Sequence, residues 1–297
     1  MTGFLERKIR GKILHVATGG FAHFIGLLEG SFEKASSFPR HRLSVFTEHH
    51  KPLGFLKFGE IFEIVSVWRT PLIEPGMWPT NLPRVERILE TRTPRTWALE
   101  TREACHQFTW LDCGLASFCC GTTECDEHVT GGRLLAPPAR FRKILRTIRL
   151  TPGLALEVQS LLPDMFDSYI GVHYRDTDRS SDFKATIANL DAAISKHRPK
   201  FVYWSSDNSS SFGWIRAAFP GVSFIEVEKP SPLSMENLHF GVSDSDAKRQ
   251  LLTALADLYC LSRSNWFIPS SGRTGWTGLI KKLRERNVYQ KFFGAIR

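Results

Sequence analysis

The sequence predicts an α/β protein made of two Rossmann-like domains that face a cleft. Two observations lead to this prediction. Strand patterns alternate with helical patterns on both sides of residues 150–167, and a glycine turn follows the first strand pattern. Helices that cross over between parallel strands produce this order of elements, and we place the domain boundary between residues 150 and 151.

The N-terminal half begins as strand, turn, helix and strand. The patterns are a strand at 12–17, a turn at Thr18-Gly19-Gly20, a helix at 21–35 and a strand at 42–48. Residues 66–132 contain scattered prolines and tryptophans and predict no topology.

The C-terminal half alternates more regularly. An apolar stripe predicts a basic amphipathic helix over 137–152, which we expect the Pro-Gly pair at 152 and 153 to end. The stripe consists of Phe141, Ile144, Leu145 and Ile148. The elements expected after it are helix 154–162, strand 168–174, helix 184–196, strand 200–205, helix 209–218, strand 222–227, helix 246–263 capped by Ser245 or Asp246, strand 265–269, and a last helix rich in lysine and arginine.

The composition excludes a disordered chain. Of the 297 residues, 42% are hydrophobic, which suits one large core or two ordinary domains. The net charge of +9 favours anionic partners, but no signature of an RNA-binding module accompanies the basic residues, so we expect no nucleic-acid partner. Residues 1–20 contain no apolar stretch with the length of a signal peptide or membrane span, so we expect a cytoplasmic protein and leave peripheral membrane contact open.

A cysteine segment lies in the N-terminal half. It holds Cys105, Cys113, Cys119, Cys120 and Cys125. With His106 and His128 these thiols could ligate zinc, but the spacings lack the paired C-x2-C arrangement of structural zinc sites. We therefore expect a packed, thiol-rich helix and no metal.

A charged stretch follows the apolar strand pattern at 168–174. His173 and Arg175 would emerge at the carboxyl end of this strand, where open α/β sheets bind ligands. The planar guanidinium of Arg175 suits phosphate oxygens, although an ordinary surface cluster of arginine and aspartate is the alternative. Asp176 and Asp178 could instead hold a divalent cation, but neighbouring arginines would already neutralise them, so we expect no metal here.

Two further segments offer polar groups beside apolar strand or helix patterns. Asp207 and Asn208 follow strand 200–205 and could bind a ribose or a base, with helix capping as the alternative. Asp257 lies within the apolar pattern of helix 246–263. Ser270 and Ser271 precede the last helix, whose free amide groups could meet phosphate, or could simply belong to a capped connection.

Taken in order, three segments resemble the fucosyltransferase superfamily that contains the rhizobial nodulation fucosyltransferase and the eukaryotic core α1,6-fucosyltransferases. The segments are IGVHYRDTD, VYWSSDN with the later FP, and LADLYCLSRSNWFIPSS. A Leu-His pair of that family corresponds here to Leu238 and His239. The resemblance covers residues 137–280 and is identified by the order of the segments rather than by any one of them.

The resemblance implies a GT-B architecture with an acceptor-side domain at 1–150 and a GDP-sugar-binding domain at 151–297. It also implies transfer of fucose from GDP-fucose to an oligosaccharide acceptor, with inversion, without a cofactor and without a required metal. The implied donor-binding residues are His173, Arg175, Asp207, Asn208, His239, Asp257, Ser270 and Ser271. Among these, Arg175 would contact the pyrophosphate and Asp257 would read guanine.

Two points in this family pattern stay open. Asp176 stands where the eukaryotic members have a second arginine. We name Arg175 and Asp178 as catalytic residues, Arg175 to offset charge on the departing GDP and Asp178 as a candidate base, with Asp182 as the alternative base. A GT-B enzyme that uses another sugar nucleotide, and an inactive relative that binds nucleotide or glycan, are the alternative functions.

Overall fold

The chain forms two compact units. The computed structural model describes residues 11–16, 20–37, 41–47, 51–65, 73–75, 107–110, 116–119, 127–131, 141, 143–164, 168–175, 182–230, 242–270, 275–294 and 296. The first unit contains Met1–His50 and Leu56–Ile148, and the second contains Lys51–Phe55 and Arg149–Arg297. The acceptor and donor roles expected for residues 1–150 and 151–297 stay predictions.

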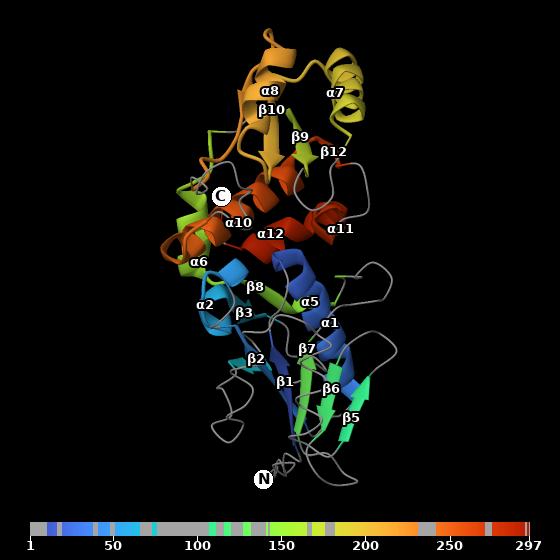
Figure 1. The fold of residues 1–297 in the computed structure, drawn as a ribbon, viewed down its shortest axis with the longest axis vertical. Coiled ribbons are helices and arrows are strands. Elements are labelled where there is room, and N and C mark those ends of the chain that lie inside the picture. The colour runs from blue at the N-terminus through green and yellow to red at the C-terminus, as the bar shows by residue number, and fades with distance from the viewer. Residues whose placement is uncertain are drawn as a thin grey trace, which may run out of the picture. The chain divides into compact units, whose positions relative to one another are not determined.

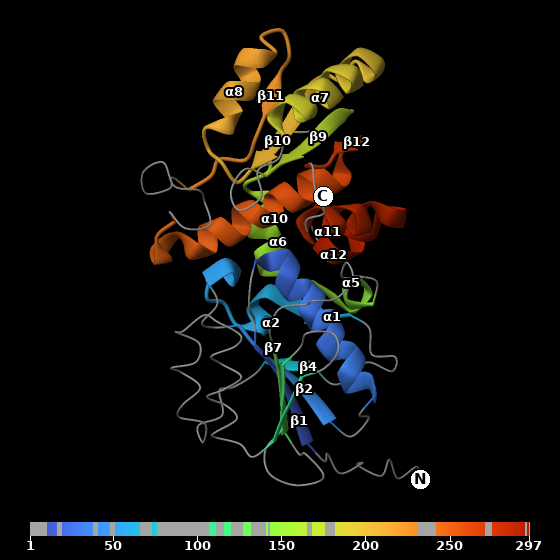
Figure 2. The same cartoon turned by 45° about the vertical axis from the view of Figure 1, so that its right-hand side comes forward.

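The first unit is built on a mixed sheet (Figure 2). The predicted opening is confirmed, with β1 (Gly11–Val16), α1 (Phe21–Ser37) and β2 (His41–Phe46) in sequence. The strand order among the described residues is β4 (Ile73–Pro75), β2, β1, β7 (Glu127–Gly131), β6 (Ala116–Cys119) and β5 (Gln107–Trp110). The strands β4, β2, β1 and β7 are parallel to one another. Strand β6 is antiparallel to both of its neighbours, β7 and β5.

Helix α1 contributes much of the apolar core of this unit. Its buried side chains recur at three- and four-residue spacings, as expected for a helix with one face toward the core, and include Phe21, Phe24, Ile25, Leu28 and Phe32. Phe21 and Phe24 contact the ring of Phe62, which begins β3 (Phe62–Ile64) directly after α2 (Phe58–Ile61). The buried carboxylate of Glu29 accepts a hydrogen bond of 2.8 Å from the backbone N–H of Lys143.

The thiol-rich helix expected around 105–128 is wrong wherever the structure describes this segment. Residues 107–110, 116–119 and 127–131 are strands, and Cys119 is paired with Gln107 on one side and His128 on the other. Aromatic and hydroxyl-bearing residues such as those of QFTW favour pleated strands over helix, and glycine and threonine lie between them. Cys105, His106, Cys113, Cys120 and Cys125 lie outside the described residues.

The long basic helix expected over 137–152 is also wrong. Among the described residues of this segment the helix is one turn, α5 (Ile144–Thr147), and the chain then extends as β8 (Ile148–Leu150). The carbonyl of Thr147 accepts a hydrogen bond of 2.7 Å from Val65 N, so the turn ends in strand-like pairing. Pro152 does not end a helix but begins α6 (Pro152–Gln159), because Thr151 caps that helix by accepting from Leu154 N.

The second unit contains a parallel sheet with the order β11 (Phe224–Ile225), β10 (Phe201–Ser206), β9 (Tyr169–Tyr174) and β12 (Trp266–Ile268). The connecting helices match the prediction and are α7 (Phe183–His197), α8 (Ser211–Ala218) and α10 (Ala247–Arg263). The last basic helix is divided into α11 (Gly275–Arg284) and α12 (Val288–Phe293) by left-handed backbone at Arg286 and Asn287. Asp246 precedes α10, but its carboxylate accepts from Ser243 rather than capping the helix.

The two faces of this sheet pack against different helices (Figure 1). Ile170, Val172, Val202 and Trp204 form a buried cluster with side chains of α7 and α8. Alternate residues along the strands face α10, and Gly171 lies so close to this helix that a Cβ would come within 2.8 Å of Ser264 Oγ. Side chains that point from the strands toward this second face therefore contact α10 directly.

The short segment 51–55 packs on the start of α10. Lys51 forms an ion pair of 3.0 Å with Asp244, and Leu53 is fully buried. Gly54 has a φ of +66°, and a Cβ there would lie 2.9 Å from the Cα of Lys248, so this position requires glycine. Of the helices within the described ranges, none combines the length and apolar character needed to span a bilayer.

Candidate active site

The strand order of the second unit creates a switch point beside β9. The chain runs from β9 to β10 and β11 on one side and returns to β12 on the other. Ligands of open α/β sheets bind at the carboxyl ends of the strands at such a point. His173 near the end of β9 is buried here, and its Nδ1 lies 3.4 Å from Ser270 Oγ and 3.4 Å from Thr277 Oγ1.

The imidazole of His173 is neutral near pH 7. Burial, together with the positive charges of Arg175 and Lys229, lowers its pKa to about 3. A neutral ring brings no charge of its own to a phosphate group. It can, however, orient the hydroxyls of Ser270 and Thr277, which come from the loop after β12 and the first turn of α11.

Arg175 follows β9 and faces the residue that follows β10. Its Nε lies 3.9 Å from Asp207 Oδ2, and both side chains are largely buried, with 21% and 15% of their surfaces exposed. The guanidinium carries five N–H donors in a planar fork. This arrangement places a cation at the carboxyl edge of the sheet and restrains it from one side.

Asn208 shapes the turn before α8. Its Oδ1 accepts a hydrogen bond of 2.9 Å from Ser210 N, and its carbonyl accepts one of 2.7 Å from Ser211 Oγ. The same Ser211 hydroxyl accepts from the buried indole N–H of Trp204 at 3.0 Å. These contacts hold the turn before α8, whose N-cap Ser210 has no side-chain cap bond, and the contact of Asn208 with a nucleoside stays a prediction.

Asp257 is a buried carboxylate in the middle of α10. It accepts a hydrogen bond from the phenol of Tyr203 and another from Ser205, both on the face of β10 that α10 covers. Burial raises the pKa of Asp257, and the charge of Lys229 and these two hydrogen bonds oppose that rise. A carboxylate held in this way can accept N–H donors from a ligand.

Lys229 and Glu226 are site residues that the sequence analysis missed. The Nζ of Lys229 donates a hydrogen bond of 2.6 Å to Ser206 O and lies 3.8 Å from Glu226 Oε2. Burial raises the pKa of Glu226, with Lys229 opposing and Asp257 adding to the rise. Both residues follow β11 at its carboxyl end, and Lys229 also follows the strand pattern at 222–227, so the rule that led to Arg175 could have found Lys229.

Comparison with known proteins places this geometry in a known fold. No family model and no curated protein matches the chain. Among solved structures, the fucosyltransferase NodZ from Bradyrhizobium is 17% identical with a TM-score of 0.56 over 92% of this chain and 93% of that one. POFUT1 in complex with GDP-fucose is 10% identical with a TM-score of 0.53 over 94% and 95% of the two chains. The chain has the GT-B fucosyltransferase fold.

The predicted resemblance to fucosyltransferases is thus confirmed at the level of the fold. A further match is the NodZ alpha-1,6-fucosyltransferase soaked with GDP-fucose, which is 18% identical with a TM-score of 0.57 over 92% of both chains. Three expected site residues, Asp178, His239 and Ser271, lie outside the described residues, as does Asp176. Within the described ranges, no group of three or more metal-ligating side chains occurs. Because Asp176 and Asp178 lie outside those ranges, the metal alternative at these two residues stays untested.

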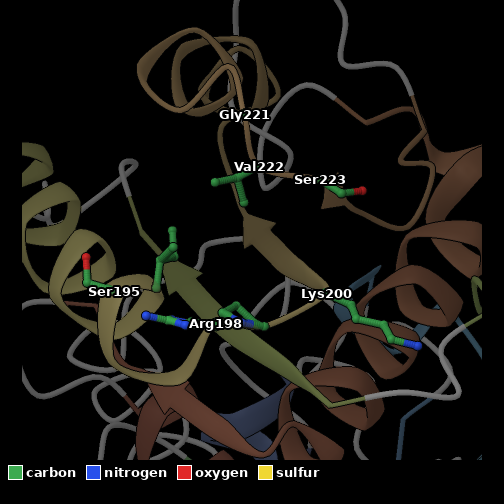
Figure 3. A pocket seen from close by; sticks show the side chains of 8 residues that line it. Ser195, Arg198, Lys200, Gly221, Val222 and Ser223 are labelled. Atoms are coloured by element: carbon green, nitrogen blue, oxygen red, sulfur yellow. The ribbon is translucent and has the colours of Figure 1, made fainter.

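In this fucosyltransferase fold, a hollow of about 520 Å³ lies away from the candidate site. Arg198, Lys200 and Ser223 line it (Figure 3). Lys200 directly precedes β10 and Ser223 directly precedes β11, so the hollow opens at the amino ends of these strands. The residues discussed above lie at the carboxyl ends, which makes the hollow a different place from the expected donor site.

Proposed function

We propose that the protein is an inverting fucosyltransferase that transfers fucose from GDP-fucose to a glycan acceptor without a required metal. One observation supports this most. The restrained cation of Arg175 and the buried carboxylate of Asp257 both lie toward the carboxyl side of the sheet in the second unit, within a fold shared with proteins solved with GDP-fucose. These two groups suit the two ends of a guanosine diphosphate.

The donor would be recognised from base to pyrophosphate. Guanine presents neighbouring N–H donors, and the two carboxylate oxygens of Asp257 can accept a pair of hydrogen bonds from them. Arg175 can bind the pyrophosphate oxygens, and neutral His173 can orient hydroxyl groups beside them. The remaining residues that we assign to donor binding are Asp207, Asn208, His239, Ser270 and Ser271.

In the transfer step, the acceptor oxygen forms a bond to C1 of fucose from the side opposite GDP. The bond between C1 and the phosphate oxygen breaks, and its electron pair leaves with GDP. Arg175 would offset the negative charge that develops on the departing diphosphate. The hydroxyl proton would pass to a base, for which we propose Asp178.

Turnover on a glycan array tests this proposal. The protein is incubated with GDP-fucose and the array, with Mg²⁺ or with EDTA, and GDP release and fucosylated products are measured. We expect a fucosylated product with inverted configuration at C1 under both conditions, and none with the Arg175→Ala variant. GDP-fucose binding without any product would instead indicate a binding protein, and transfer only from another sugar nucleotide would replace the proposed donor.

We also propose a cytoplasmic site of action, with contact to acidic membrane as an open alternative. The formal net charge of +9 is the observation that keeps this alternative open. Sedimentation with vesicles of acidic phospholipid at two salt concentrations separates the two, because electrostatic binding weakens as salt rises.

A further inference from the structure

Tyr203 is a fully buried phenol with no assigned role in donor binding. Its hydroxyl donates a hydrogen bond to Oδ1 of Asp257, a residue that is itself only 7% exposed. A buried hydroxyl and a buried carboxylate each need a partner, and here each supplies the other's. The contact therefore belongs to the interior of the second unit and not to its surface.

The pleat of β10 directs this phenol toward α10. Val202 and Trp204 belong to the buried cluster on the side of α7 and α8, so Tyr203 between them points to the opposite face. The register partner of Tyr203 in β9 is Gly171, whose missing side chain lets the sheet lie close to α10. Strand pairing and this close approach together place the phenol beside Asp257.

A tethered oxygen restricts the rotation of the Asp257 carboxylate. The terminal torsion of an aspartate side chain is broad, so an untethered carboxylate samples many orientations. The phenol proton occupies one acceptor position on Oδ1 and leaves Oδ2, with the remaining lone pair of Oδ1, for other donors. A ligand with adjacent N–H donors can therefore use both oxygens of a carboxylate whose plane is fixed.

We propose that Tyr203 is a positioning residue that holds the Asp257 carboxylate in the plane that accepts the adjacent N–H donors of guanine, and so determines selectivity for guanine over adenine nucleotides. The proposal rests on the proposed function, because it takes Asp257 as the residue that contacts the base. Adenine has an acceptor nitrogen beside its amino group, so it gains less from an oriented carboxylate. The phenol acts through Asp257 and makes no contact with the nucleotide.

Tyr169 on the neighbouring strand β9 is a matched control. It is 2% exposed, and its hydroxyl donates a hydrogen bond of 2.7 Å to the carbonyl oxygen of Cys260, which also lies on α10. Tyr169→Phe and Tyr203→Phe each keep the ring that fills the core and remove one hydroxyl that ties the sheet to the same helix. Of the two, Tyr203→Phe is the one that removes the contact with Asp257.

The first test titrates GDP and ADP into the wild type and these two variants by calorimetry. Because hydrogen bonds to charged groups are the stronger ones, we expect Tyr203→Phe to weaken GDP binding by about tenfold and ADP binding far less. Tyr169→Phe should bind both nucleotides like the wild type. Equal losses for GDP and ADP, or equal losses of GDP affinity in the two variants, would indicate a merely structural role and overturn the proposal.

The second test uses the protein without nucleotide. Unfolding free energy is measured by denaturant titration for wild type, Tyr203→Phe, Asp257→Ala and the double variant. We expect Tyr203→Phe to destabilise the wild-type background more than the Asp257→Ala background, because only the first background has a buried carboxylate that loses its donor. Additive losses would mean that the phenol does not hold Asp257, and would overturn the proposal.

The failure of this proposal differs from the failure of the proposed function. If the wild type prefers GDP to ADP and Tyr203→Phe keeps the same preference, only the role of Tyr203 fails. If the wild type binds neither nucleotide, the proposed function fails and the selectivity role fails with it, while the unfolding cycle still decides whether Tyr203 holds Asp257. If Asp257→Ala does not fold, the nucleotide titration alone decides the proposal, because it needs only the two phenylalanine variants.

Discussion

The phenol of Tyr203 on β10 donates a hydrogen bond to the carboxylate of Asp257 on α10, although 54 residues separate them in the sequence. Both residues are buried, and burial raises the pKa of each. The bond ties the helix that covers one sheet face to a central strand of that sheet. It also fixes the direction in which the carboxylate can meet a ligand.

Replacing this carboxylate should remove base recognition. We expect Asp257→Asn to weaken GDP binding by about 10- to 100-fold, because an amide has one acceptor where the carboxylate has two oxygens. Binding of ADP should change far less. Isothermal titration measures both, with the exposed Asp191→Asn on α7 as the charge-matched control. Unchanged GDP affinity would remove Asp257 from the site.

Arg175 should matter for both binding and turnover. We expect Arg175→Ala to weaken GDP binding by about 10- to 100-fold, since hydrogen bonds to charged groups are the stronger ones and this variant leaves the pyrophosphate without its cation. The exposed Arg216→Ala on α8 removes the same charge elsewhere and should have no effect. A folded Arg175→Ala protein that binds GDP like wild type would contradict the site assignment.

The buried His173 should make stability depend on pH. Its pKa is about 3 in the fold against an ordinary 6.5, so the unfolded chain binds a proton that the folded chain does not as pH falls between these values. Stability should therefore decrease as pH falls through this range, by at most about 1.4 kcal/mol per pH unit from this one group. Denaturant unfolding of His173→Gln should show a shallower dependence of stability on pH than the wild type, and an unchanged dependence would contradict this expectation.

Two glycine substitutions should have opposite effects. At Gly171 a Cβ would lie 2.8 Å from Ser264 Oγ and 2.9 Å from Ser264 Cβ, so we expect Gly171→Ala to destabilise the fold by about 1–3 kcal/mol. At Gly213, inside α8, a Cβ would meet nothing within 4 Å, and Gly213→Ala should stabilise by about 0.5–1 kcal/mol through helix propensity. Thermal unfolding of the two variants tests the close approach of β9 to α10. Equal changes in stability for Gly171→Ala and Gly213→Ala would contradict that close approach.

The sequence predicts the second unit well because each of its elements has a clear period and a defined end. The segment 137–152 misleads because Phe141, Ile144, Leu145 and Ile148 are all buried, as in a helix, yet Ile148 belongs to a strand. The strands between 107 and 131 pair with one another and join β1 through β7, and periodicity does not reveal this pairing. The hydrogen bond of Lys229 to Ser206 O depends on the pairing of β11 with β10, so the sequence could offer Lys229 as a residue after a strand but not as a contact of β10.

Nucleotide selectivity is the central claim, and calorimetric titration of the wild-type protein tests it most directly. GDP, GDP-fucose, UDP and ADP are titrated with Mg²⁺ and, separately, with EDTA. We expect GDP to bind with the same affinity in both buffers, and likewise GDP-fucose. UDP and ADP should bind at least about tenfold more weakly, a difference of about 1.4 kcal/mol. Equal binding of all four nucleotides, no binding, or binding that requires Mg²⁺ would contradict the account.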